Sequence, residues 1–246
     1  MDYGPSLVNS YEIGTDGSNF AYKGIAVRLD PGPGGVSRGQ SWMVFDHDTL
    51  RVAAAWTGQG FIDWQGIHMN GRHNIHPRVK GDVQLENPTG PGWADPDSGS
   101  FNDPRLLGRD DRHYGPLPRS WAHYKGLSHH GQKTIIEYTI GDTSIRESPG
   151  LATAVGKDTT APPVFSRKFN IGPRSRSMVL QVAREVEGSD IQATLNHESQ
   201  GMAVSFGLSG SDEKAAESKQ KPLQFDGNSF VEISDSTDFD TTSKDF

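Results

Sequence analysis

Residues 134–147 read Thr-Ile-Ile-Glu-Tyr-Thr-Ile-Gly-Asp-Thr-Ser-Ile-Arg-Glu. Apolar and polar side chains alternate on both sides of Gly141-Asp142, which is typical of two strands that each bury one face. A tight two-residue turn requires a positive φ, and glycine adopts this conformation without strain. The segment therefore predicts a β-hairpin.

Similar short extended runs, bounded by turn residues, continue in both directions along the chain. They cover residues 24–29, 41–45, 50–56, 164–171, 178–184, 191–195 and 202–206. Residues 46–49 suit a four-residue hairpin loop, and residues 172–175 suit a corner that pairs 164–171 with 178–184. No apolar stripe at helical spacing lasts for three turns. We therefore predict an all-β chain, a β-sandwich with long ordered loops, in preference to a barrel because the hairpins are unevenly spaced.

Between residues 57 and 131 the pattern changes, because this stretch holds seven of the nine histidines and three of the five tryptophans among many Gly and Pro residues. A structureless loop of that length is implausible in a compact domain. We therefore expect ordered excursions packed over one sheet and held by Trp64, Trp93, Trp121 and Tyr124.

Composition and charge exclude several functional classes. The chain of 246 residues carries a formal net charge of −7, but residues 210–246 alone hold nine acidic and four basic side chains. The remainder is nearly neutral, so we expect no nucleic-acid binding. No apolar run approaches the length of a membrane helix, so we expect no membrane insertion. The absence of cysteine excludes a disulfide framework and a thiolate metal site.

The C-terminal part predicts a second, incomplete unit. Residues 210–221 are polar and without aromatics, as in a linker, and residues 222–246 begin a new strand pair. Some 25 residues are too few to bury a core of their own. We expect a β-sandwich domain over residues 1–209, followed by the first strands of an incomplete second β domain.

That last segment carries a resemblance. The strings Leu-Gln-Phe-Asp-Gly (223–227), Phe-Val-Glu-Ile (230–233) and Ser-Asp-Ser-Thr-Asp-Phe-Asp (234–240) resemble the opening of a laminin-G-like, concanavalin A-like jelly roll. The resemblance implies a module of the kind that binds carbohydrate or protein ligands outside the cytoplasm.

Residues 2–150 carry a second resemblance. The strings that carry it are Asp-Tyr-Gly-Pro (2–5), Ala-Tyr-Lys-Gly-Ile-Ala-Val-Arg-Leu-Asp-Pro-Gly (21–32), Phe-Asp-His-Asp-Thr-Leu-Arg (45–51), Asn-Gly-Arg-His (70–73) and Tyr-Gly-Pro-Leu-Pro-Arg (114–119). They resemble the bacterial domain-of-unknown-function family 6797, which we expect to cover residues 2–209. The family recurs in large secreted proteins, beside jelly rolls and c-type cytochrome modules. The resemblance thus implies an extracellular or periplasmic fragment, with other modules of the full-length chain as neighbours and Met1 as an internal residue. It assigns no catalytic residue.

Two histidine groups raise the question of a metal. His73 and His76 are three residues apart on a turn-rich segment, and His47 is flanked by Asp46 and Asp48. Such spacing can serve a metal. Alternatively these imidazoles satisfy backbone groups in long loops, which is the interpretation we adopt, and we predict neither a metal nor another cofactor.

A second constellation combines residues 103–105 (Asp-Pro-Arg) with residues 109–114 (Arg-Asp-Asp-Arg-His-Tyr). Paired carboxylates can cleave a glycosidic bond, with arginine holding the substrate. Adjacent Asp110 and Asp111 would point to opposite sides of an extended segment, so any pair must join distant residues, such as Asp46 or Asp63 with Asp103. The commoner outcome is an Arg–Asp ladder that fixes irregular loops.

We hypothesise that aromatic, histidine and arginine side chains of these loops bind carbohydrate. The candidate residues are Asp46, His47, Trp64, Arg72, His73, His76, Arg109, Asp110, Arg112, His113 and Trp121. Tyr114 and Trp93 could also offer flat faces to sugar rings, although aromatics more often belong to a core. Two alternatives stay open: a glycan hydrolase or lyase using the Asp and His residues of the same loops, and a scaffold without catalysis.

Overall fold

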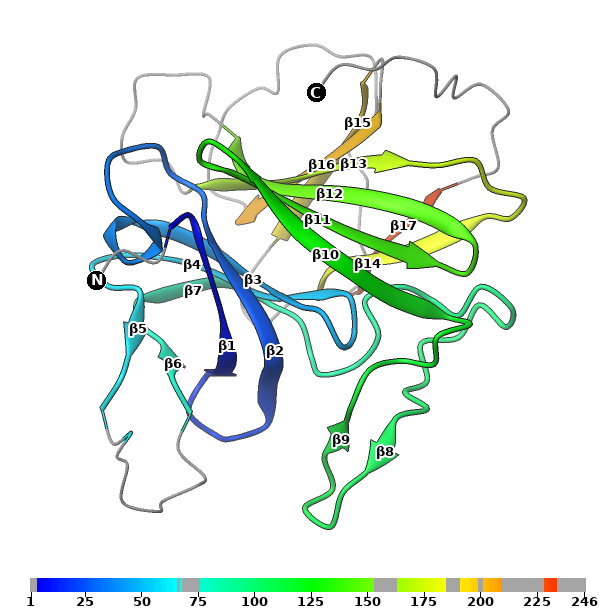
Figure 1. Cartoon of the computed structure of the whole chain (residues 1–246), viewed down its shortest axis with the longest axis horizontal. Coiled ribbons are helices and arrows are strands. Elements are labelled where there is room, and N and C mark those ends of the chain that lie inside the picture. The colour runs from blue at the N-terminus through cyan, green and yellow to red at the C-terminus, as the bar shows by residue number, and fades with distance from the viewer. Residues whose placement is uncertain are drawn as a thin grey trace.

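The computed structural model describes residues 4–65, 67, 76–152, 163–184, 191–198, 201–208 and 228–233. Within these residues the chain is almost entirely β, with a single 3-10 turn, η1 (Val36–Arg38). Two large sheets pack against each other as a sandwich (Figure 1), which confirms the predicted all-β class. The described part has no helix of the length and apolarity that crossing a membrane would require.

The first large sheet has seven strands. Their order is β5 (Ile62–Asp63), β6 (Arg78–Val79), β1 (Ser6–Ile13), β2 (Asn19–Arg28), β3 (Ser41–Asp46), β4 (Arg51–Thr57) and β7 (Asp82–Glu86). β3 and β4 form the predicted hairpin around residues 46–49. The stretch after residue 57 was predicted to be loops over a sheet, but it supplies three strands, β5, β6 and β7, to the sheet itself.

The central strands of this seven-stranded sheet are buried on both faces. In β4, Val52 and Ala55 belong to the core that faces the second sheet, whereas Ala53 and Trp56 belong to an outer core. The indole of Trp56 donates to the carbonyl of Phe61 at 3.2 Å, which closes the outer core. Small alanines therefore suit this strand, because layers pack closely on both of its sides.

The second large sheet has six strands. Their order is β10 (Ala122–His130), β11 (Lys133–Ile140), β12 (Thr143–Ala152), β13 (Val164–Ile171), β16 (Gly201–Leu208) and β15 (Ile191–Glu198). β11 and β12 are the hairpin predicted first, and Gly141 at its turn has φ +52°. β10 is bulged between Tyr124 and Gly126 where it pairs with β11. β15 and β16 pair as a further hairpin.

One predicted pairing is wrong. Residues 164–171 and 178–184 are strands, but β13 pairs with β12 on one edge and β16 on the other. Because both edges of β13 are occupied, β14 (Met178–Arg184) must pair elsewhere. Its partner is β17 (Asn228–Ile233), and its other edge bonds to the segment around Trp93, with the amide of Ala94 donating to the carbonyl of Val179 at 2.9 Å. Whether residues 222–246 open a separate jelly roll stays a prediction.

A fully buried polar network lies in the core between the two sheets. The guanidinium of Arg167 donates to both carboxylate oxygens of Glu147, at 2.5 and 3.0 Å. The hydroxyl of Tyr138 donates to the same carboxylate at 2.7 Å and accepts from the indole of Trp93 at 3.3 Å. Burial together with the Glu147 charge raises the pKa of Tyr138 well above its usual value. The phenol therefore stays protonated as a donor.

Two of the tryptophans predicted to hold the loops do so. Trp93 and Trp121 are buried, and the indole of Trp121 donates to the carbonyl of Trp93 at 3.2 Å. Trp64 does not, because its side chain is 46% exposed at the end of β5. A short strand before a turn leaves this residue at the margin of the sheet.

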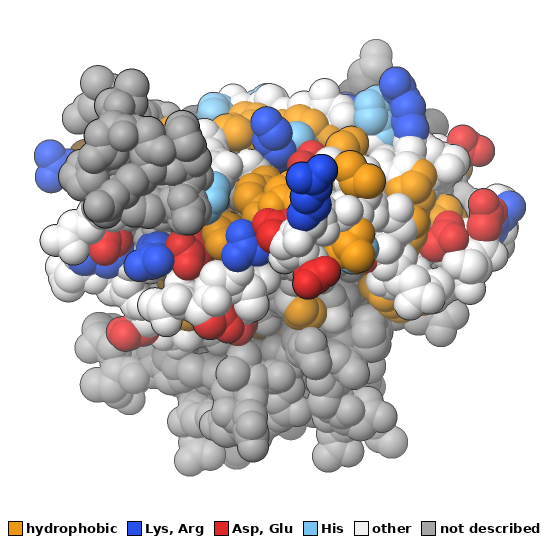
Figure 2. Space-filling model, turned by 90° about the horizontal axis from the view of Figure 1, so that it is seen from below, with side chains coloured by type: hydrophobic (Ala, Val, Ile, Leu, Met, Phe, Trp, Pro, Cys, Tyr) orange, Lys and Arg blue, Asp and Glu red, His pale blue; other side chains and the backbone are white. Residues whose placement is uncertain are grey.

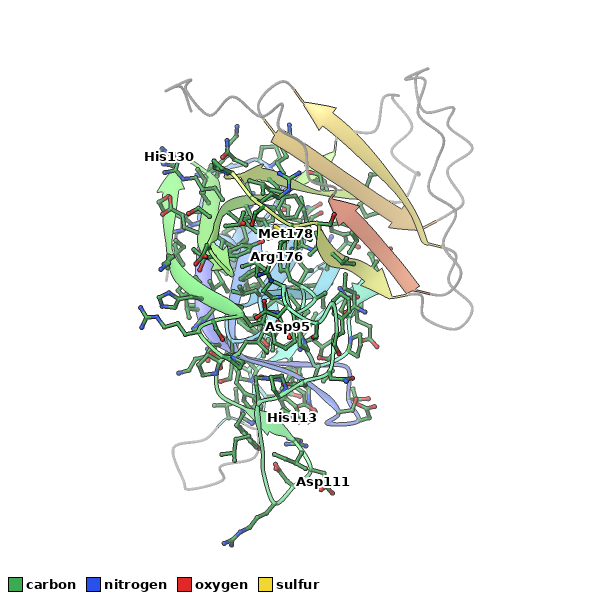
Figure 3. The ribbon with its side chains drawn as sticks, turned by 90° about the vertical axis from the view of Figure 1, so that its right-hand side faces the viewer. Asp95, Asp111, His113, His130, Arg176 and Met178 are labelled. Atoms are coloured by element: carbon green, nitrogen blue, oxygen red, sulfur yellow. The ribbon has the colours of Figure 1, made fainter. Side chains whose placement is uncertain are left out.

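A small hairpin projects beyond both sheets. It consists of β8 (Leu106–Leu107) and β9 (His113–Tyr114), with Asp111 near its tip, as the lower parts of Figure 1 and Figure 3 show. Asp111 has φ +58°, and the amide of Gly108 donates to the carbonyl of Arg112 at 2.7 Å to close the turn. At its base Arg105 is buried and donates to the carbonyl of Gly115 at 3.2 Å. The β8–β9 hairpin is therefore anchored at its base and exposed at its tip.

Candidate functional site

The β8–β9 hairpin separates two groups of candidate residues. Successive side chains of a strand point to opposite faces, so Tyr114 and His113 diverge. Tyr114 contacts β2, whereas His113 contacts the segment around Asp103. Seen from below in Figure 2, this end of the molecule carries hydrophobic, basic, acidic and histidine side chains together.

The group on the Tyr114 side, which we call the aromatic site, is built on β2. Phe20 and Tyr22 are two positions apart and therefore share a face, with parallel rings whose centroids lie 5.3 Å apart. The ring of Tyr114 stacks on Tyr22 at 5.1 Å, and the Arg112 guanidinium lies over Phe20 at 4.4 Å. His76 meets the rings of Phe20 and Tyr22 edge-on, at 5.2 and 5.9 Å.

Polar atoms converge at the outer side of the aromatic site. The hydroxyl of Tyr22 donates to that of Tyr114 at 3.4 Å, and Tyr114 donates to the carboxylate of Asp110 at 2.6 Å. The hydrogen bond to Asp110 raises the pKa of Tyr114 above its usual value, and the same bond lowers the pKa of Asp110. Arg112 lies 3.8 Å from Asp110 and donates to the carbonyl of Gly17 at 2.7 Å. Two phenols, a carboxylate and a guanidinium thus meet in one place.

His76 is the imidazole of the aromatic site. Burial lowers its pKa, as does the positive charge of Arg112, and these effects outweigh the opposing influence of Glu12. The ring is therefore neutral at pH 7 and offers one donor and one acceptor.

The second group, which we call the carboxylate cluster, contains Asp46, Asp48 and Asp103 with the arginines Arg51 and Arg105. Asp46 is buried, accepts from the hydroxyl of Thr49 at 2.8 Å and lies 3.7 Å from the Nε atom of Arg51. Burial raises the pKa of Asp48, as does the negative charge of Asp46. Burial lowers the pKa of Arg51 to about 10.

Asp103 behaves differently because Arg105 binds it directly. Arg105 donates to both oxygens of the Asp103 carboxylate, at 2.7 to 3.1 Å. Burial acts to raise the pKa of Asp103, but the hydrogen bonds from Arg105 outweigh it and leave the pKa below its usual value. His113 lies 3.9 Å from this carboxylate, with its Nδ1 atom 3.0 Å from the carbonyl of Arg105. This is the Arg–Asp ladder expected as the alternative to catalysis.

A histidine–tyrosine stack lies beside the carboxylate cluster and joins the two sheets. His47, in the β3–β4 turn, stacks on Tyr124 of β10 with ring centroids 4.6 Å apart. The Nδ1 atom of His47 lies 3.4 Å from the carboxylate of Asp48. Within the described residues, no three His, Asp or Glu side chains are arranged to hold a metal ion.

The structure brings the predicted site residues together in part. His76, Asp110 and Arg112 meet in the aromatic site, whereas Asp46 belongs to the carboxylate cluster and His47 and His113 lie beside it. The remaining described candidates are separate from both groups, with Trp64 and Arg109 exposed and Trp121 buried. Arg72 and His73 lie outside the described residues.

Sequence reasoning missed Phe20 and Tyr22, which form the floor of the aromatic site. Their i, i+2 spacing just before the run at 24–29 was a readable signal of two aromatics on one strand face. Their contact with residues more than ninety positions later was not readable, because it depends on where the β8–β9 hairpin folds back.

Comparison with known proteins gives one match. Residues 43–147 match the family described as Domain of unknown function (DUF6797), a narrower span than the expected residues 2–209. No curated protein and no solved structure matches the chain. The matched span contains the carboxylate cluster and the part of the aromatic site after β2, so both groups fall in the part of the chain that is similar to the DUF6797 family.

Proposed function

We propose that this domain binds carbohydrate at the aromatic site. The observation that carries the proposal is the convergence of Tyr22, Tyr114, Asp110 and Arg112 over stacked rings at the surface. A sugar hydroxyl both donates and accepts hydrogen bonds, so it can bind a carboxylate, which accepts, a guanidinium, which donates, and a phenol hydroxyl, which does both. Aromatic rings suit the apolar faces of sugar rings, because their large flat surfaces bury apolar area.

The rigidity of the aromatic site supports this proposal. Tyr22, Tyr114, Asp110 and Arg112 are each already held by another of these side chains, so the ligand does not need to order them. A site that is ordered in advance loses less side-chain entropy on binding. The resemblance of residues 222–246 to a jelly roll fits the same proposal, in which the chain acts outside the cytoplasm beside further modules.

The first prediction is that Tyr114→Ala weakens glycan binding by roughly ten- to thirtyfold, as expected for a central interface residue worth about 1.4–2 kcal/mol. The measurement is retardation in native gels containing soluble polysaccharides, followed by calorimetry with oligosaccharides of whichever polymer retards the protein. Tyr114→Phe keeps the ring and should lose less.

Leu107→Ala is the matched control, because Leu107 is exposed on the same hairpin and pairs with His113, on the opposite face from Tyr114. Equal losses in Tyr114→Ala and Leu107→Ala would show that only the hairpin fold matters and would count against the aromatic site.

One observation favours a second candidate function, cleavage of a glycan that reaches the carboxylate cluster. Asp48 has a pKa raised by burial and by Asp46, as a general acid for a glycosidic bond requires. Release of reducing ends that disappears in Asp48→Asn would establish it, whereas binding without product would leave carbohydrate binding alone.

A further inference from the structure

A row of paired residues runs from the aromatic site across the end of the seven-stranded sheet. Phe20 of β2 is the cross-strand partner of Glu12 in β1, Glu12 is the partner of Arg78 in β6, and Arg78 is the partner of Asp63 in β5. Directly paired residues project from the same face of a sheet. We call these four residues the cross-strand row.

The length of the cross-strand row bears on the size of the ligand. Neighbouring strands lie about 4.7–4.9 Å apart, so the three steps from β2 to β5 cover roughly 14–15 Å. Such a distance exceeds one sugar ring and suits several linked units. Within the row Phe20 and Glu12 are buried, whereas the side chain of Arg78 is 46% exposed, so Arg78 is the residue placed to contact such a ligand.

The charges of the cross-strand row and the aromatic site nearly cancel. Arg78 lies 3.0 Å from Glu12, and Arg112 lies 3.8 Å from Asp110. With Asp63 the set contains three acids and two bases. A site for a polyanionic glycan needs an excess of positive charge, and these five described residues have none. The exposed members of the set, Arg78, Arg112 and Asp110, instead offer donors and acceptors to uncharged hydroxyls.

We propose that the ligand is an uncharged, extended oligosaccharide whose chain crosses β2, β1, β6 and β5, with Arg78 as the contact for its far end. This inference rests on the proposed carbohydrate binding and adds the class of glycan, its direction and a further specificity-determining residue. The aromatic site holds one end of the chain, and the exposed Arg78 extends the contact beyond the buried Glu12.

The test begins with native gels that contain either neutral polymers (xylan, galactomannan, mixed-linkage β-glucan) or polyanions (polygalacturonate, alginate). The chain should be retarded by a neutral polymer, and raising the salt concentration should leave the retardation unchanged, because no net charge is neutralised. Retardation by polyanions alone would overturn the inference but leave carbohydrate binding intact. If no gel retards the chain, the proposed function falls together with the inference.

Calorimetry then compares the disaccharide and the hexasaccharide of the retarding polymer. The native chain should bind the hexasaccharide roughly tenfold more tightly, as expected for one hydrogen bond to a charged group. Arg78→Ala should remove this gain and leave the disaccharide affinity unchanged, whereas Tyr114→Ala should weaken both. Equal affinities for the two lengths in the native chain, or an unchanged gain in Arg78→Ala, would overturn the inference.

Two controls separate recognition from folding. Arg146→Ala removes a similarly exposed arginine that pairs with Glu137 at 3.2 Å in the six-stranded sheet, and it should leave both affinities unchanged. Arg78→Lys keeps a positive charge beside Glu12 but lacks the planar fork, and it should fold normally while losing part of the gain. Loss of disaccharide binding in Arg78→Ala with a native unfolding midpoint would overturn the assignment of Arg78 to the far end.

Discussion

At the scale of single residues, Asp48 and Asp103 belong to the same cluster, but their pKa values are shifted in opposite directions. Burial acts to raise the pKa of both carboxyls. Asp103 receives hydrogen bonds from Arg105, which bring its pKa below the usual value, whereas Asp48 faces Asp46 and its pKa stays raised. The pairing of Asp103 with Arg105 is local in sequence and was predictable as a ladder. The burial of Asp48 depends on distant segments and was not.

This difference gives a prediction about stability and pH. A raised folded-state pKa contributes stability at low pH that is lost as the pH rises through it, so Asp48→Asn should be more stable than the native chain near neutral pH. A lowered folded-state pKa contributes stability above the unfolded pKa that is lost as the pH falls through the folded value. Asp103→Asn should therefore be less stable near neutral pH, with the difference shrinking in acid.

The measurement is the urea midpoint of each variant from about pH 3 to about pH 7. Changes of the same sign for both substitutions near neutral pH would contradict the assignment of opposite pKa shifts.

At the scale of elements, local pattern predicted strands better than it predicted their partners. The β11–β12 hairpin was readable because its turn chemistry is contained in two adjacent residues, Gly141 and Asp142. The pairing of β13 with β14 was mispredicted because β14 instead receives backbone bonds from residues near Trp93, far earlier in the chain. The same holds for the aromatic site. The spacing of aromatic residues in β2 could be read from the sequence, whereas the position of the β8–β9 hairpin over β2 could not.

The segment before Trp93 gives a prediction at this scale. A Cβ added to Gly92 would lie 2.3 Å from the carbonyl oxygen of Leu50 and 2.6 Å from the Cα of Arg51. Both obstacles are backbone, which cannot rotate away, so Gly92→Ala should lower the free energy of unfolding by roughly 1–3 kcal/mol.

Gly126 is the control, because nothing lies within 4 Å of a Cβ added there. Urea unfolding should show Gly126→Ala close to the native chain. If Gly92→Ala matched it, the close approach of the two segments would be disproved.

At the scale of the whole molecule, the two sheets enclose a charged pair in an otherwise apolar layer. Glu147 and Arg167 are both fully buried, and Tyr138 and Trp93 extend the hydrogen-bond network of the Glu147 carboxylate. Taking two ions out of water costs free energy that their attraction only partly returns. The alternation places Glu147 in phase with the buried Ile145, and Arg167 in phase with the buried Phe165 and Phe169, so both positions read as inward-facing. That the two side chains pair with each other was not readable, because it depends on how β12 and β13 lie together.

Arg167→Met should therefore destabilise the protein by about 3–5 kcal/mol, because it leaves the Glu147 carboxylate buried without its partner. Adding Glu147→Gln should recover much of that loss, since the amide is neutral and still accepts from Tyr138. Urea denaturation of the single and double variants measures both values. Losses that simply add in the double variant would contradict a coupled pair.

The bulge in β10 has a consequence for the protein in concentrated solution. Among the described strands, β10 borders the six-stranded sheet and pairs only with β11. A regular edge strand has unpaired backbone groups that can pair with a strand of another molecule and start a fibril. The bulge between Tyr124 and Gly126 interrupts this regular row of groups in β10. Lys125, also on this strand, adds a charge that opposes such stacking. The bulge in β10 therefore opposes self-association of the protein into amyloid fibrils.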